Sequence, residues 1–157
     1  MPLSSEKYDR SDMRLQAVLR ALREAYVSGE AFTFEEVVNR HVFEDMLGHA
    51  HQLLSDEHKL AATVVAGACL ERHLRKIAGK HDVPLTRDNG KRRQIADVNS
   101  DLKKYDVISQ ATWRQIEAWL DLRNDAAHGD DAAADHTRET LQRMIAGIRE
   151  FIAWMPA

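Results

Sequence analysis

The sequence predicts an all-α protein, and three observations support this prediction. Apolar residues recur every three to four positions along most of the chain, which is the spacing of one helix face. No segment alternates polar and apolar residues over the length of a strand. Glycine and proline are few, at 7 and 3 of 157 residues, while alanine, leucine, arginine and glutamate abound. We therefore expect an antiparallel helical bundle with an extra N-terminal helix pair.

Length, composition and charge narrow the class of protein. A chain of 157 residues, 44% of them hydrophobic, can bury one sizeable core without disulfides or metals. The single cysteine, Cys69, excludes an intrachain disulfide and a multi-cysteine zinc site. Because no apolar run approaches the roughly 20 residues that span a bilayer and no signal pattern opens the chain, we expect a cytoplasmic protein. A net charge of -3 argues against a surface that binds nucleic acid throughout, but it allows a local basic groove.

Two helices are expected in the first third of the chain, over residues 11–28 and 34–54. An apolar stripe at helical spacing predicts the first of them. Thr33 and Glu36 form a capping box that starts the second, because both side chains accept backbone N–H groups at the helix start. The two domains that we expect are an N-terminal helical extension, residues 1–55, and a main helical domain, residues 56–157.

The third helix is expected to lie at the centre of the core. Ala61–Leu70 is apolar or small at almost every position, so neighbours can cover this helix on all sides. Its Ala66–Cys69 run would let one neighbouring helix approach closely. We expect Ser55 or Asp56 to cap this helix and Gly79 to end it.

A basic connection over residues 81–94 and three more helices complete the chain. The connection contains an Asn89–Gly90 turn, and its length of about 14 residues is more typical of functional or mobile loops than of simple links. A short helix starts at Ile95, Ser109 caps the next, and Asp135 caps the last. The apolar stripe of the last helix consists of Leu141, Met144, Ile145, Ile148 and Ile152.

The end of the fifth predicted helix concentrates side chains that are suited to chemistry on a phosphate. Asn124 and His128 are four residues apart and share one helix face, with Arg123 adjacent to it. Gly129 tolerates the left-handed conformation that stops a helix, so His128 would lie in the last turn, where the helix dipole favours its imidazolium form. The same pattern is also typical of a solvated helix tip, since an arginine and a histidine five residues apart occur about once by chance in this composition.

Four features together resemble the HEPN superfamily, the higher-eukaryote-and-prokaryote-nucleotide-binding domains. They are the small-residue helix Ala66–Arg75, the basic connection, the helix that ends in Leu122–Gly129, and the closing amphipathic helix. The resemblance covers about residues 56–155, and its specific part is the Arg-polar-x3-His motif. It implies an all-α bundle that dimerises so that two motifs face each other across a cleft.

The resemblance also implies a function for that cleft. In catalytic HEPN proteins it is an endoribonuclease site that needs neither a metal nor a cofactor. Many small bacterial members belong to toxin-antitoxin or phage-defence systems, which implies an RNA substrate, a homodimer and an antitoxin or defence-system partner protein. The helices before residue 55 have no counterpart in the minimal domain.

The side chains fit this chemistry. An imidazole is suited to take up or release a proton near neutral pH, so His128 would act as base or acid, and a second copy from a dimer partner would serve as the other. Arg123 is a permanent cation with a fork that matches phosphate, and Asn124 would orient the imidazole or the phosphate. The expected products are a 2',3'-cyclic phosphate and a 5'-hydroxyl.

Two further groups have a functional and an ordinary interpretation. Glu71 follows the apolar run, so it would be partly buried and orient Arg123 or His128, or it would be a surface carboxylate paired with Arg75. The basic connection would bind the RNA backbone through phosphate contacts, or it would be a solvated loop. The basic residues concerned are Arg87, Lys91, Arg92 and Arg93.

A non-catalytic protein is the alternative to the ribonuclease. In this interpretation the same fold is a dimerisation or adaptor module that binds RNA, nucleotide or a partner protein. The acidic balance of the chain favours it, because Asp121, Asp125, Asp130 and Asp131 near the motif weaken the attraction for RNA. A third class, a structural subunit of a larger assembly, is suggested by the extra N-terminal helices.

Overall fold

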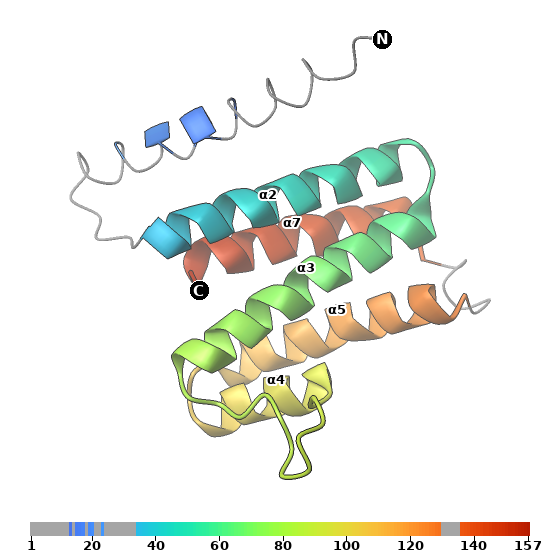
Figure 1. The fold of residues 1–157 in the computed structure, drawn as a ribbon. Helices are drawn as coiled ribbons and strands as arrows, with labels where there is room; N and C mark the ends of the chain where they lie inside the picture. Colours follow the sequence, from blue (N-terminus) through green and yellow to red (C-terminus); the bar gives the residue numbers. More distant parts are fainter. Residues whose placement is uncertain (1–12, 14, 18, 21–22, 24–33, 130–135) are drawn as a thin grey trace, which may run out of the picture. The chain divides into compact units, whose positions relative to one another are not determined.

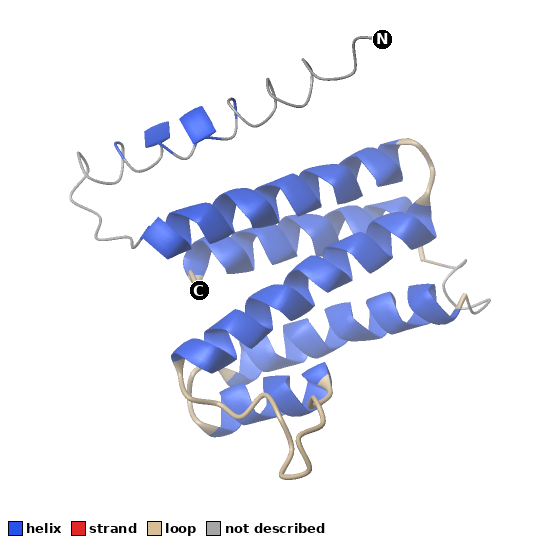
Figure 2. Ribbon diagram, viewed as in Figure 1, coloured by secondary structure: helices blue, strands red, loops and turns tan. Residues whose placement is uncertain are grey.

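The computed structural model describes the chain except for residues 1–12, 14, 18, 21–22, 24–33 and 130–135. Over this part of the chain the regular secondary structure is helical, and an isolated bridge between Thr86 and Arg92 is the only strand-like pairing, which confirms the all-α prediction (Figure 1, Figure 2). The helices are α2 (Phe34–Ser55), α3 (Lys59–Lys80), α4 (Ile95–Lys104), α5 (Gln110–His128) and α7 (Arg138–Trp154).

The predictions for the N-terminal region fall partly outside this range. Within the segment 11–28 that we expected to be a helix, the described positions are helical. The capping residue Thr33 lies outside the described residues, and α2 begins directly after it, as predicted.

Two compact units divide the chain, Met1–Val42 and Phe43–Ala157. We expected the division after residue 55, but the second half of α2 contributes an apolar face to the core of the second unit. The α2 residues in that core are Phe43, Leu47, Ala50 and Leu54, at most 2% exposed. Their spacing of three and four residues is that of one helix face, so the main unit begins within α2.

Helix α3 is the central helix of the second unit, as its composition predicted. It packs against α4, α5 and α7, and the ring of His73 on α3 contacts Phe43 of α2 (Figure 1). Small and apolar side chains allow this arrangement because they can be covered from several directions. The buried α3 residues are Ala62, Thr63, Ala66, Gly67, Cys69, Leu70, His73, Leu74, Ile77 and Ala78.

The ends of α5 follow the sequence prediction. The hydroxyl of Ser109 accepts a backbone N–H of the first turn, and Gly129 adopts a φ of 64° directly after His128. A left-handed conformation suits glycine because it has no Cβ, so His128 is the last residue of the helix. Thr137 caps α7 in the same way as Ser109 caps α5, whereas the predicted cap, Asp135, lies outside the described residues.

The start of α3 differs from the prediction. We expected Ser55 or Asp56 to cap it, but α2 continues through Ser55, whose hydroxyl donates back to an α2 carbonyl. Asp56 lies in the turn between the helices, where its carboxylate accepts the side-chain amide of Gln52. Helix α3 therefore begins after His58 and has no side-chain cap.

The connection between α3 and α4 is a folded hairpin. Helix α3 ends at Lys80, one residue beyond the predicted Gly79. The chain takes up the left-handed conformation at Asp82, with a φ of 56°, and not at Gly79. The Asn89–Gly90 turn then reverses the chain as predicted, with a φ of 76° at Gly90. We call residues 81–94 the hairpin below.

The thiol of Cys69 is expected to be inert in the folded protein. Its side chain is fully buried on α3, within 3.8 Å of the carbonyl of Phe43, and burial raises the pKa of the Cys69 thiol to about 12. Because the thiolate is the nucleophile, the native protein should not react with a chromogenic disulfide at mildly alkaline pH, and should react fully once denatured. Absorbance of the released thiolate measures both. Reaction of the native protein at the rate of a free cysteine would contradict this prediction.

Candidate functional site

Arg123 lies across Gly67 where α5 meets α3. A β-carbon added to Gly67 would lie 2.5 Å from the Cβ of Arg123 and closer still to its Cγ, so glycine leaves the space that this side chain fills. The Arg123 side chain is 30% exposed, and its Nε is buried without a hydrogen-bond partner in the described part of the chain. The small residues of α3 predicted a close helix approach, and the structure confirms it and identifies Arg123 as the group that uses it.

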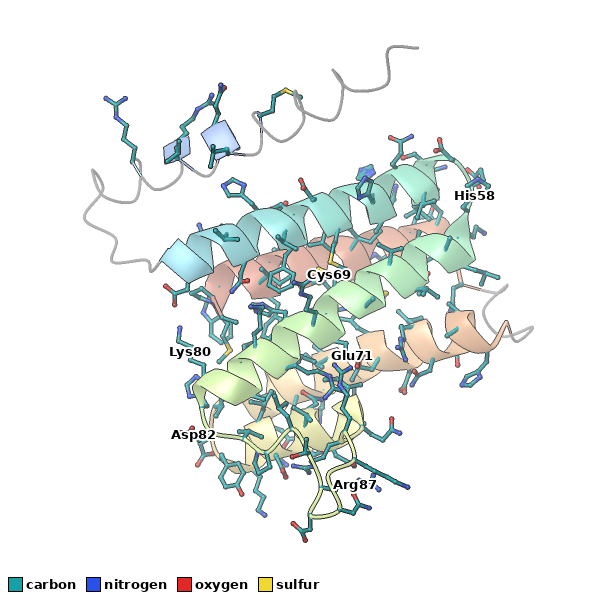
Figure 3. The ribbon with its side chains drawn as sticks, viewed as in Figure 1. His58, Cys69, Glu71, Lys80, Asp82 and Arg87 are labelled. Atoms are coloured by element: carbon teal, nitrogen blue, oxygen red, sulfur yellow. The ribbon has the colours of Figure 1, made fainter. Side chains whose placement is uncertain are left out.

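Glu71 lies one helical turn beyond Gly67, on the side of α3 that faces α5 (Figure 3). Its Oε2 accepts a hydrogen bond from Nη2 of Arg123 at 3.2 Å. Its Oε1 accepts from Nη2 and Nε of Arg75, at 3.0 and 3.2 Å. The sequence left two interpretations of Glu71 open, pairing with Arg75 and orientation of Arg123, and the carboxylate does both at once. The Glu71 side chain is only 21% exposed, so its carboxylate has little freedom to move. Its hydrogen bond therefore fixes the direction of the Arg123 guanidinium.

Asn124 and His128 lie on the exposed side of the same helix end. The side-chain oxygen of Asn124 accepts a hydrogen bond from Nη1 of Arg123 at 3.0 Å. His128 follows Asn124 by about one helical turn of roughly 5.4 Å. The end of α5 therefore presents a guanidinium, an amide and an imidazole in sequence, and only the guanidinium is anchored to another helix.

A hydrogen-bond contact that the sequence did not predict lies beside this helix end. Nε2 of His136 and a carboxylate oxygen of Asp125 are 3.2 Å apart. The sequence carries no signal for it, because Asp125 lies in α5 and His136 lies in the segment before α7. The contact holds His136, two residues before α7, next to the last turn of α5.

The basic residues that we expected to bind RNA have different surroundings. Arg93 serves the fold, because its guanidinium lies 2.6 Å from the carboxylate of Asp101 and its side chain is only 18% exposed. Its backbone carbonyl also accepts a hydrogen bond from Arg75 at 3.0 Å. The accessible members of the set are Arg87, Lys91 and Arg92. Arg93 therefore fastens the hairpin to α3 and α4, while the other three basic side chains are exposed, so RNA binding and a solvated loop both stay open for them.

Two other kinds of feature, a metal centre and a membrane span, have no candidate among the described residues. The described side chains include no group of three or more histidine, cysteine, aspartate or glutamate placed to hold a metal ion. Where helices are described, none has both the length and the apolar character of a bilayer span. Comparison with protein families, with curated proteins and with solved structures gives no match. Fold and site define a helical protein in which a carboxylate of the central helix orients an arginine beside an exposed amide and imidazole.

Proposed function

We propose that the chain is a metal-independent endoribonuclease of the HEPN type, with a HEPN-like arrangement of its helices. In this proposal it acts in the cytoplasm as a homodimer, as a toxin or phage-defence component that a partner protein regulates. The observation that supports it most is the arginine held by Glu71, with Asn124 and His128 exposed on the same helix end. Metal-independent RNA cleavage needs these groups: a proton acceptor and donor, and a fixed positive charge.

The reaction that fits these groups forms a bond between phosphorus and the 2'-oxygen and breaks the bond between phosphorus and the 5'-oxygen. His128 of one copy takes the proton of the 2'-hydroxyl, and the 2'-oxygen attacks phosphorus. The imidazolium of His128 from the second copy protonates the 5'-oxygen as it leaves. Arg123 stabilises the negative charge that develops on the phosphoryl oxygens, and Asn124 orients the phosphate or the ring. The products are a 2',3'-cyclic phosphate and a 5'-hydroxyl.

Incubation of the purified protein with total RNA in EDTA tests the proposal. The wild type is expected to cleave the RNA, and His128→Ala is expected to lower the rate about 100-fold, because the proton transfers lose their group. Arg123→Ala is expected to cause a similar loss. Analysis of the new ends should find cyclic phosphate and 5'-hydroxyl.

The decisive variant is His128→Ala, because its exposed side chain contributes little to the fold. His49→Ala is the matched control, since His49 is an exposed histidine of α2 away from the end of α5. It should cleave as the wild type does, and all variants should show the same circular dichroism spectrum. Intact RNA with the wild-type dimer, or equal cleavage by wild type and His128→Ala, would refute the proposal.

A non-catalytic adaptor is the second candidate, and one observation favours it. The ion pair with Glu71 already occupies one amino group of Arg123, which leaves less of its charge for a phosphate. Acidic side chains on the same helix, such as Asp121 and Asp125, also lower the attraction for RNA. RNA binding without cleavage in the same assay would support this candidate over the ribonuclease.

A further inference from the structure

A hollow of about 750 Å³ lies between α3 and the hairpin. The cations that line it are Arg72, Arg75 and Lys76 of α3 and Arg92 of the hairpin. Glu71 is the one carboxylate among the described lining residues, and it is already bound by two arginines. In a chain with a net charge of -3, this hollow is therefore a local positive site.

Arg75 brings a buried donor to the hollow. Its side chain is 11% exposed, and Nε and Nη2 bind Glu71 and the carbonyl of Arg93. Its Nη1 is buried and has no hydrogen-bond partner in the described structure. A buried, unpaired N–H of a charged group is costly, so negative charge in the hollow beside this guanidinium would stabilise the arrangement.

The rest of the lining is suited to an organic group. Ala68 and Leu85 contribute apolar surface, and Gly90 has no side chain that would fill the space. The volume is within the range of about 300 to 1,000 Å³ that is typical of small-molecule sites. A ligand here would place a compact anion against the arginines and a small apolar body against Ala68 and Leu85.

We propose that the hollow binds a phosphomonoester, a phosphate group carried on a small organic body. Such a phosphate is close to doubly charged at neutral pH and offers several acceptor oxygens, which suits four surrounding cations better than a carboxylate does. The exposed Arg72 and Arg92 close around the phosphate from the two walls, and the Arg75 guanidinium adds positive charge to the lining. The proposal holds whether or not the end of α5 cleaves RNA.

Isothermal titration calorimetry with the full chain tests the proposal. The probes are inorganic phosphate, adenosine 5'-monophosphate and adenosine, and a short DNA strand with a 5'-phosphate or a 5'-hydroxyl. Phosphorylated probes should bind and their unphosphorylated counterparts should not. Preference for the mononucleotide indicates a free metabolite, and preference for the phosphorylated strand indicates a nucleic-acid end; both outcomes support the phosphomonoester.

Three variants link the binding to the hollow. Arg72→Ala and Arg92→Ala should each weaken binding about tenfold, because each removes one charge-assisted contact. Arg114→Ala, which removes an exposed arginine of α5 outside the hollow, should leave the affinity unchanged. Glu71→Gln should strengthen binding about fivefold, since it removes the one negative charge of the lining. A purely structural role of Glu71 would not produce a gain.

The outcomes that overturn the proposal are equally specific. They are no binding of any phosphorylated probe, equal binding of phosphorylated and unphosphorylated probes, or equal weakening by Arg92→Ala and Arg114→Ala. Because DNA has no 2'-hydroxyl, the strands stay intact whether or not the chain is a ribonuclease. Failure of RNA cleavage and failure of phosphate binding are therefore distinguishable.

Discussion

Gly67→Ala is expected to lower the free energy of unfolding by about 3 kcal/mol, because it forces apart the contact between α3 and α5. The new methyl group would lie 2.5 Å from the Cβ of Arg123, an atom next to the backbone that a change of rotamer does not move. Relief therefore requires a shift of the helices, and such a shift also moves Arg123 away from Glu71. Urea denaturation followed by circular dichroism measures the loss.

A matched control separates this clash from the general effect of replacing a helical glycine. Gly48 lies within α2, and a β-carbon added there would meet nothing within 4 Å. Gly48→Ala should therefore raise the free energy of unfolding by up to about 1 kcal/mol, through helix propensity. Shortening the clashing side chain in Gly67→Ala/Arg123→Ala should recover part of the loss. Equal stability of Gly67→Ala and wild type would disprove the close approach.

His73 is expected to make the protein about 3 kcal/mol less stable at pH 4 than at neutral pH. Its ring is 1% exposed and packs edge-on against Phe43 and Phe151, with centroid distances of 5.1 and 5.6 Å. Its Nε2 lies 2.8 Å from the carbonyl of Met155, which can only accept, so Nε2 carries the hydrogen. A second proton would go to Nδ1, which is buried and has no described partner. Burial accordingly lowers the pKa of His73 from 6.5 to about 4.

The direction of the pH effect follows from this lowered pKa. Between pH 6.5 and about 4, His73 binds a second proton in the unfolded chain but not in the folded chain. The contribution of His73 is therefore complete above pH 6.5, falls as the pH drops through this range, and is gone below about 4. Each unit of pKa corresponds to about 1.4 kcal/mol, which sets the size of the loss.

The measurement is urea denaturation at a series of pH values. His73→Gln keeps a hydrogen-bond donor but cannot titrate, so it should be less stable at neutral pH and lose less stability on acidification than the wild type. His49→Gln, at an exposed position of α2, should follow the wild-type curve. Identical pH dependence of His73→Gln and wild type would show that His73 is not the responsible group.

Much of the fold was predictable because its signals are local. The apolar stripe of α7, the cap at Ser109, the end of α5 at Gly129 and the Asn89–Gly90 turn all depend on neighbouring residues. The structure confirms each of them. The start of α3 was wrong because Ser55 had two possible uses, and its hydroxyl bonds within α2 and does not cap the next helix.

The candidate site divides in the same way. The sequence by itself determined which groups end α5, since Arg123, Asn124 and His128 follow from helical spacing and one glycine. It also determined that α3 is central and has a small-residue face. Only the tertiary structure decided that Glu71 binds Arg75 and Arg123 together.

Long-range contacts explain this difference. The pairing of Glu71 with Arg123 joins residues 52 positions apart, and the contact of Gly67 with Arg123 depends on how closely two helices pack. The hydrogen bond from His73 to the carbonyl of Met155 joins residues 82 positions apart. Helical periodicity specifies which face a residue occupies, but only packing specifies which residue of another helix lies opposite it. For this protein the sequence therefore determined the helices and the candidate groups, and the tertiary structure decided their partners.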